Sequence, residues 1–123
     1  MPLQIKPSVT NPTIADVYQL IDEGRLILRP EFQRKFVWTH EHQEAFIDTV
    51  LKGLPFPEIY VCKGEVDVQK LRTTRLVIDG QQRLTTIRNY IEGKYEHPLV
   101  KTRPYQDLSN EEKQEFLSYQ IVI

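Results

Sequence analysis

The segment 76–87, with the sequence LVIDGQQRLTTI, constrains the fold more than any other part of this chain. It begins with apolar and β-branched residues, which are typical of a short buried strand. The dipeptide Asp79-Gly80 ends that strand, and apolar residues then recur at helical spacing as far as Ile91. An Asp-Gly turn between two strands is the alternative interpretation, but glutamine, arginine and leucine are good helix formers. The segment therefore predicts a strand, a glycine turn and a helix over Gln81–Glu92.

A helix that begins directly after a glycine turn presents backbone N–H groups that attract an anion. Arg83 falls in the first turn, where the helix dipole disfavours a cation, so its place is better explained if an anion binds at the same end. Gln81 and Gln82 can donate side-chain amides to that anion, and Thr85 can add a hydroxyl. Solvated glutamines, and an ordinary surface ion pair between Arg83 and Asp79, are the alternatives.

A second candidate for anion binding is the segment 30–38, PEFQRKFVW. An arginine between aromatic residues can stack on a base or hold a phosphate, whereas a core strand with Arg34 reaching solvent is the alternative. Gln33-Arg34 repeats the Gln82-Arg83 pair, and each pair is flanked by apolar residues. We therefore hypothesise that the two pairs converge on one polyanion.

The rest of the chain is predicted as short helices and strands. Three helices begin at capping patterns and end near residues 24, 52 and 117, and their caps are Thr13, Thr39 and Ser109. Strands are expected at 25–29, 59–62 and 76–78, a polar hairpin or loop around Gly64 at 63–73, and a last strand from 119. Helices and strands without regular βαβ alternation indicate an α+β fold.

The composition indicates one soluble domain over residues 1–123, with 40% hydrophobic and 27% charged residues. No apolar run is long enough for a membrane, and no secretory signal is evident, so a cytoplasmic location is expected. The net charge of −1 conceals a basic block at 69–94, with six basic residues against two acidic ones. That block indicates phosphate contacts or, alternatively, a solvated basic face. Because the chain ends within a predicted strand, we expect an N-terminal fragment or truncated form, or an edge strand that a partner completes.

Few other residues indicate a catalytic or metal-binding site. Cys62 is the one cysteine, and its apolar surroundings predict a buried, inert thiol. His40 and His42 are two residues apart and form no zinc-ligand pattern.

Three motifs together resemble a known family. They are Pro30-x-Phe32-Gln33-Arg34-x-x-Val37-Trp38, Gly53-x-Pro55-x-Pro57 and the stretch IDGQQRLTT at 78–86. They are similar to the N-terminal ParB-like domain of the GmrSD-type modification-dependent restriction systems, and the resemblance extends from about Thr13 to Ile123.

This resemblance implies a ParB/sulfiredoxin-like α+β fold whose DGQQR segment holds nucleotide phosphates. It also implies NTP hydrolysis with Mg²⁺ in support of DNA restriction against phage, with the nuclease in a separate C-terminal HNH-type domain or subunit that this chain lacks. Self-association into a homodimer stays open. Sulfiredoxin needs a cysteine in its phosphate loop, and glutamine and arginine stand there in this chain, so a redox role is disfavoured.

The site residues follow from the same resemblance. The expected nucleotide-binding residues are Gln33, Arg34, Gly80, Gln81, Gln82, Arg83 and Thr85. Asp79 and Arg83 are the expected catalytic residues, and Asp79 either orients Arg83 or positions Mg²⁺ or a water.

The main alternative function is a DNA-binding or modification-sensing module without its own catalysis. Its expected contacts are Arg34, Trp38, Arg72 and Arg75. A small-molecule phosphotransferase and a structural adaptor are the remaining alternatives.

Overall fold

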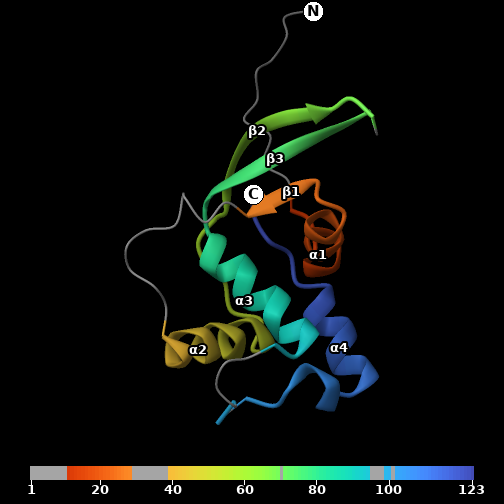
Figure 1. Ribbon diagram of the computed structural model, residues 1–123. Helices are drawn as coiled ribbons and strands as arrows, with labels where there is room; N and C mark the ends of the chain where they lie inside the picture. The colour runs from red at the N-terminus through yellow and green to blue at the C-terminus, as the bar shows by residue number, and fades with distance from the viewer. Residues whose placement is uncertain (1–10, 29–38, 70, 95–98, 101) are drawn as a thin grey trace, which may run out of the picture.

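The computed structural model describes residues 11–28, 39–69, 71–94, 99, 100 and 102–123. The elements in chain order are α1 (Ile14–Asp22), β1 (Leu26–Leu28), α2 (His40–Leu51), β2 (Tyr60–Asp67), β3 (Arg72–Asp79), α3 (Gln81–Glu92), the 3-10 turn η2 (Tyr105–Asp107) and α4 (Asn110–Leu117) (Figure 1). This mixture of helices and strands confirms the predicted α+β class. No helix in the described part of the chain is long and apolar enough to cross a membrane.

The strands form one sheet in the order β1-β3-β2, with β3 in the centre. β1 runs parallel to β3, and β2 runs antiparallel to it. Among the described residues, β1 pairs with residues 75–77 of β3, whereas β2 and β3 pair as far as Asp67 and Arg72. The outer part of the β2–β3 hairpin therefore projects from the body of the molecule (Figure 1).

This hairpin corrects the predicted strand lengths. The strand expected at 59–62 continues to Asp67, and the strand expected at 76–78 already begins at Arg72. The turn of the hairpin lies between Asp67 and Arg72. Gly64, where the turn was expected, lies inside β2 at a register irregularity. A strand signal is present there, since Val66 and Val68 alternate with Glu65 and Asp67, but the run is short, stands among polar residues and has exposed valines.

The prediction of a buried Cys62 is wrong, because the thiol is exposed. Val61 pairs with Val77, which is fully buried, and Cys62 pairs with Leu76 on the opposite face of the sheet. Successive residues of a strand point to opposite faces, so an apolar run does not bury every member.

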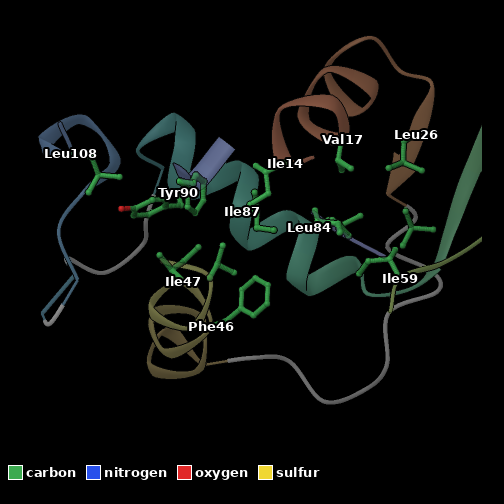
Figure 2. Close-up of a cluster of buried hydrophobic side chains, with 14 residues drawn as sticks. Ile14, Val17, Leu26, Phe46, Ile47, Ile59, Leu84, Ile87, Tyr90 and Leu108 are labelled. Atoms are coloured by element: carbon green, nitrogen blue, oxygen red, sulfur yellow. The ribbon is translucent and has the colours of Figure 1, made fainter. Parts of the chain in front are cut away.

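The apolar core surrounds α3, with α1 and α2 on different sides of it (Figure 2). Leu84, Ile87 and Tyr90 of α3 are at most 4% exposed. Full burial of a large apolar side chain contributes about 1.5–3 kcal/mol, so the position of α3 is fixed by packing on several sides. Its Tyr90 hydroxyl also donates to the carbonyl of Arg103 at 2.6 Å.

The predicted helix starts at Thr13, Thr39 and Ser109 are confirmed. Each hydroxyl accepts a hydrogen bond from the backbone N–H three residues later, and the side chain of that later residue accepts one from the backbone N–H of the cap. Because these bonds join residues three apart, the sequence alone predicts them.

The last predicted strand, from 119 to the end, is not a regular strand. Its backbone forms one isolated bridge, between Gln120 and Thr13. Nearby, the N–H of Ile121 donates to the Pro12 carbonyl at 2.8 Å, and the N–H of Ile59 donates to the Val122 carbonyl at 2.9 Å. The segment is therefore held between two other parts of this chain, which the sequence pattern did not reveal.

Gly80 joins β3 to α3 in a conformation that other residues disfavour. Its φ of 104° and ψ of 12° lie in the left-handed region. A Cβ at this position would also lie 2.3 Å from Cδ1 of Ile59, which is fully buried. The Asp79-Gly80 pair is thus a strand-to-helix junction and not a hairpin turn.

We expect Gly80→Ala to lower the free energy of unfolding by roughly 2 kcal/mol or more, because it adds an overlap with Ile59 to the left-handed strain. Gly53→Ala is the matched control, since Gly53 has φ 72° and no neighbouring atom within 4 Å of an added Cβ. It should cost only about 1 kcal/mol. Urea denaturation followed by circular dichroism measures both, and equal losses would contradict the role of the Ile59 contact.

A hydrogen bond between helices makes stability depend on pH. The Tyr18 hydroxyl donates to Oε2 of Glu92 at 2.8 Å, which ties α1 to the end of α3. This bond, ahead of smaller contributions from Lys94 and Arg88 and against partial desolvation, lowers the pKa of Glu92 below its ordinary 4.5. The stability that this bond contributes is therefore present above the pKa that Glu92 has in the unfolded chain. It is lost as the pH falls through the lower pKa that Glu92 has in the folded protein.

We expect Tyr18→Phe to lower the free energy of unfolding at pH 7 by about 0.5–1 kcal/mol, which is small because solvent reaches the pair. The difference from the wild type should shrink as the pH falls through and below 4.5, where Glu92 becomes protonated. Denaturant titrations at several pH values measure it. A difference that stayed constant down to pH 3 would show that the lost hydroxyl acts through packing.

Candidate functional site

The candidate site is the start of α3, where β3 ends at Asp79 and the helix begins on Gly80. No side chain caps this helix start. The Gly80 carbonyl accepts the first helical hydrogen bond, from the N–H of Leu84 at 3.0 Å. The three N–H groups before Leu84 lie in the first turn, at the positive end of the helix dipole. This end of the helix therefore has the polarity that suits an anion.

The guanidinium of Arg83 lies against the connection that leads into β2. It donates to the Pro57 carbonyl, its Cζ lies 5.8 Å from the centre of the Phe56 ring, and Nη2 is 3.8 Å from Oδ2 of Asp79. The Arg83 side chain is only 11% exposed. The Asp79–Arg83 contact expected from the sequence is present, but it is not an ordinary surface pair, because Arg83 is packed between a carbonyl and an aromatic ring.

Gln81 has a structural contact that the sequence did not indicate. It is 5% exposed, and its side-chain Nε2 donates to the Val77 carbonyl at 2.8 Å. The side-chain amide thus fastens the helix start to the strand before it. This corrects the expectation of a Gln81 side chain that is solvated or turned toward a ligand; its backbone N–H is unaffected by this bond.

Gln82 and Thr85 are half-buried on the first turns of α3. The next residue, Thr86, is buried, and its hydroxyl donates to the Gln82 carbonyl at 2.6 Å, one turn back along the helix. Bonds of this kind are common for threonine inside helices. Of the two threonines in the motif, Thr85 is therefore the one with more access to solvent.

The structure brings the motif residues from Asp79 to Thr85 together at one strand-to-helix junction. Arg75 lies four residues before Asp79 on β3 and is exposed. Arg72 begins the same strand, and its side chain lies outside the described residues. The predicted residues Gln33, Arg34 and Trp38 also lie outside them, so their convergence with Gln82 and Arg83 stays a prediction.

Sequence reasoning did not assign Phe56, Pro57 and Ile59 to the site. All three meet the start of α3, through Arg83 and Gly80. The Gly53-x-Pro55-x-Pro57 spacing was the available signal, since the residue before each proline is held extended. An extended connection leaves its carbonyls unpaired by local structure, and Arg83 binds one of them.

Carboxylate and imidazole groups do not gather into a cluster of three in the described part of the chain. His42 has its Nδ1 3.4 Å from the N–H of Thr39, as part of the cap of α2. Asp79, with its side chain 37% exposed, is the carboxylate at the start of α3 that could meet a cation held by phosphates. Mg²⁺ often binds in that way, through one or two carboxylates together with substrate phosphates.

Comparison with known proteins identifies the family. The model of the GmrSD restriction endonuclease N-terminal domain matches residues 14–122. An uncharacterized protein of Methanocaldococcus jannaschii is 33% identical over 112 residues, a match that covers 75% of this chain and 19% of that protein. The chain thus spans about a fifth of the length of this relative. No solved structure matches the chain.

The family model covers nearly the whole described chain, from the first helix to the final segment. This confirms the family expected from the sequence motifs. The chain belongs to the family of N-terminal domains of GmrSD restriction endonucleases.

Proposed function

We propose that this domain binds a nucleoside triphosphate at the start of α3 and hydrolyses it within a larger restriction protein that defends against phage. The observation that supports this most is the junction at Gly80, where α3 begins on a left-handed glycine without a side-chain cap. N–H groups in the first turn of a helix attract phosphate oxygens, because hydrogen bonding and the helix dipole act in the same direction.

In this proposal the phosphates are held chiefly by backbone groups. Gly80 lets the chain turn without adding a side chain of its own at the helix start, and the N–H groups of Gln81 and Gln82 face the phosphates. The Gln82 side chain and the Thr85 hydroxyl add donors, whereas the Gln81 side chain holds the junction through Val77. Gln33 and Arg34 are included in the proposed site because of the sequence motif at 30–38.

Arg83 stabilises the charge that develops during hydrolysis. A water oxygen bonds to the γ-phosphorus and gives up its proton to a phosphate oxygen or to solvent. The bond from that phosphorus to the bridging oxygen breaks, and negative charge grows on the leaving diphosphate. A guanidinium has five N–H donors, so the bond to the Pro57 carbonyl leaves others for a phosphate oxygen. Packing against Phe56 holds the group in place, which reduces the entropy lost on binding.

Asp79 fits the role of contact for Mg²⁺, because it ends β3 beside the proposed phosphate position and keeps part of its carboxylate accessible. When bound, Mg²⁺ would neutralise phosphate charge. Asp79 also orients Arg83 through their 3.8 Å contact. On the family resemblance, the nuclease of the restriction system would be supplied by an HNH-type domain or subunit. The relative from Methanocaldococcus jannaschii is about five times as long as the matched part, which leaves length for further domains.

The alternative function, a DNA-binding module without catalysis, draws on Arg34, Trp38, Arg72 and Arg75. The described structure favours it at one place, the exposed Arg75 on β3. That surface is separate from the start of α3 and does not compete with the nucleotide proposal.

Nucleotide binding should raise the melting temperature of this chain. A ligand at 100 times its dissociation constant stabilises a fold by about 2.7 kcal/mol, which a thermal-shift screen of the four NTPs with and without Mg²⁺ would detect. We expect Arg83→Ala to weaken binding roughly 10- to 100-fold, since a charged hydrogen bond contributes about 1.5–3 kcal/mol.

Arg88→Ala is the matched control, because Arg88 lies on the same helix and lines a different cavity, beside Tyr18 and Glu92. It should leave the nucleotide-induced shift unchanged. Circular dichroism without ligand checks that both variants fold. Equal affinity of the wild type and Arg83→Ala would remove Arg83 from the site.

The Asp79→Asn variant tests the contribution of Mg²⁺ separately from the binding of the nucleotide itself. We expect the wild type to be stabilised more by NTP with Mg²⁺ than by NTP with EDTA, and the variant to be stabilised equally in both. Asparagine has nearly the same shape, and its side-chain oxygen can take the place of the carboxylate oxygen 3.8 Å from Arg83, so the fold should be retained. Full Mg²⁺ dependence in the variant would place the metal contact elsewhere.

A further inference from the structure

One face of the projecting β2–β3 hairpin carries cations directly opposite each other. Lys63 of β2 and Arg75 of β3 are register partners, so their side chains share a face, and both are exposed. Thr73, two residues before Arg75, is on the same face. We call this side of the hairpin, defined by Lys63, Thr73 and Arg75, the hairpin face.

The hairpin face has no ion pair of its own in the described part of the chain, and the acidic residues of β2, Glu65 and Asp67, lie further out on the hairpin. No acidic side chain there pairs with Lys63 or Arg75. Like charges directly opposite across an antiparallel pair are destabilising. Arg83, in contrast, lies close to Asp79. An anion on the hairpin face would convert the repulsion between Lys63 and Arg75 into attraction for a shared partner.

A third cation lies at the root of the same hairpin. The Arg25 carbonyl accepts from the N–H of Arg75 at 2.9 Å, which fixes the two residues side by side. The Arg25 Nη1 is 3.9 Å from Oε2 of Glu23, which is a long contact at the surface. Its Nε is buried and makes no hydrogen bond within the described residues. The Arg25 side chain as a whole is 42% exposed, so the rest of its guanidinium is open to a ligand.

Arg25, Thr73 and Arg75 line one cavity of about 190 Å³. The remaining walls are apolar, formed by Leu20, Leu26, Val61 and Ile123. The cavity is smaller than the roughly 300–1,000 Å³ of pockets that hold a whole drug-sized ligand. It therefore suits one phosphate group better than a complete nucleotide, and two arginines with a hydroxyl are the donors that phosphate oxygens accept from.

We propose that the β2–β3 hairpin is a duplex-DNA-binding arm, with one backbone phosphate held at its root by Arg25 and Arg75. The site is distinct from the nucleotide site proposed above, because Arg75 precedes Asp79 by four residues, about 13 Å along an extended strand. The outer part of the hairpin projects from the body of the molecule (Figure 1).

The shape and tip of the hairpin favour DNA over other polyanions. A two-stranded ribbon fits the major groove of B-form DNA, whereas the deep, narrow major groove of duplex RNA excludes side chains. Val66, Val68 and Leu71 at the outer end are 59%, 79% and 86% exposed. Apolar side chains beyond the Lys63–Arg75 pair can contact sugars and thymine methyl groups once phosphates hold the arm in place.

The test measures binding of a fluorescent duplex of about 20 base pairs to the 123-residue chain over a range of salt concentrations. Each phosphate contact contributes about 0.9 to the slope of log K against log salt. We expect Arg25→Gln and Arg75→Gln each to lower that slope by about 1 and to weaken binding at low salt. Lys94→Gln removes one exposed charge at the far end of α3 and should change neither.

Two further measurements distinguish duplex DNA from free phosphate and from the nucleotide. In a thermal-shift measurement, inorganic phosphate should raise the melting temperature of the chain far less than the duplex does. Stabilisation by phosphate without duplex binding would overturn the assignment to DNA. Equal salt slopes in the wild type and both arginine variants would overturn it as well. The nucleotide-induced thermal shift should be retained in Arg75→Gln. A failure of the DNA-binding proposal is therefore distinguishable from a failure of the nucleotide-binding proposal.

Discussion

The close contact between Gly80 and Ile59 is the constraint on which the rest of this structure depends. Only a glycine can adopt φ 104° there and leave room for the Ile59 side chain. This junction directs α3 from the end of the central strand into the middle of the core, where α1 and α2 pack on different sides of it (Figure 2). Gln81 reinforces the junction through the Val77 carbonyl. The same glycine that allows the core to form thus leaves the helix start without a side-chain cap.

Arg83 gives this junction its electrostatic character. A cation in the first turn of a helix is disfavoured by the dipole, and here the Pro57 carbonyl and the nearby Asp79 carboxylate offset that cost. The arrangement fixes the guanidinium before any ligand arrives. A preorganised charge needs little rearrangement as a phosphoryl group reacts, which is the condition under which electrostatic stabilisation is most effective.

Local features of this protein could be predicted from the sequence, and features that depend on distant partners could not. The caps at Thr13, Thr39 and Ser109 join residues three apart, so the sequence contains both partners of each bond. The exposure of Cys62 depends on which face of the sheet the core covers, and the bonds of Ile121 depend on Pro12, more than a hundred residues away. At the candidate site, the motif located the helix start, but the contacts of Arg83 with Phe56 and Pro57 needed the fold.

β3 relates the two proposed phosphate sites. It is paired on both sides at residues 75–77, with β1 parallel and β2 antiparallel, so its backbone has little freedom to bend there. Arg75 lies at the outer end of this doubly paired region, and Asp79 follows Val77 by two residues on the same strand. A duplex on the hairpin would therefore be held at a fixed distance from a nucleotide at α3. β3 joins the two sites and is too rigid to absorb a displacement of the hairpin. Any coupling between the duplex and the nucleotide would therefore act through the position of the hairpin relative to the core.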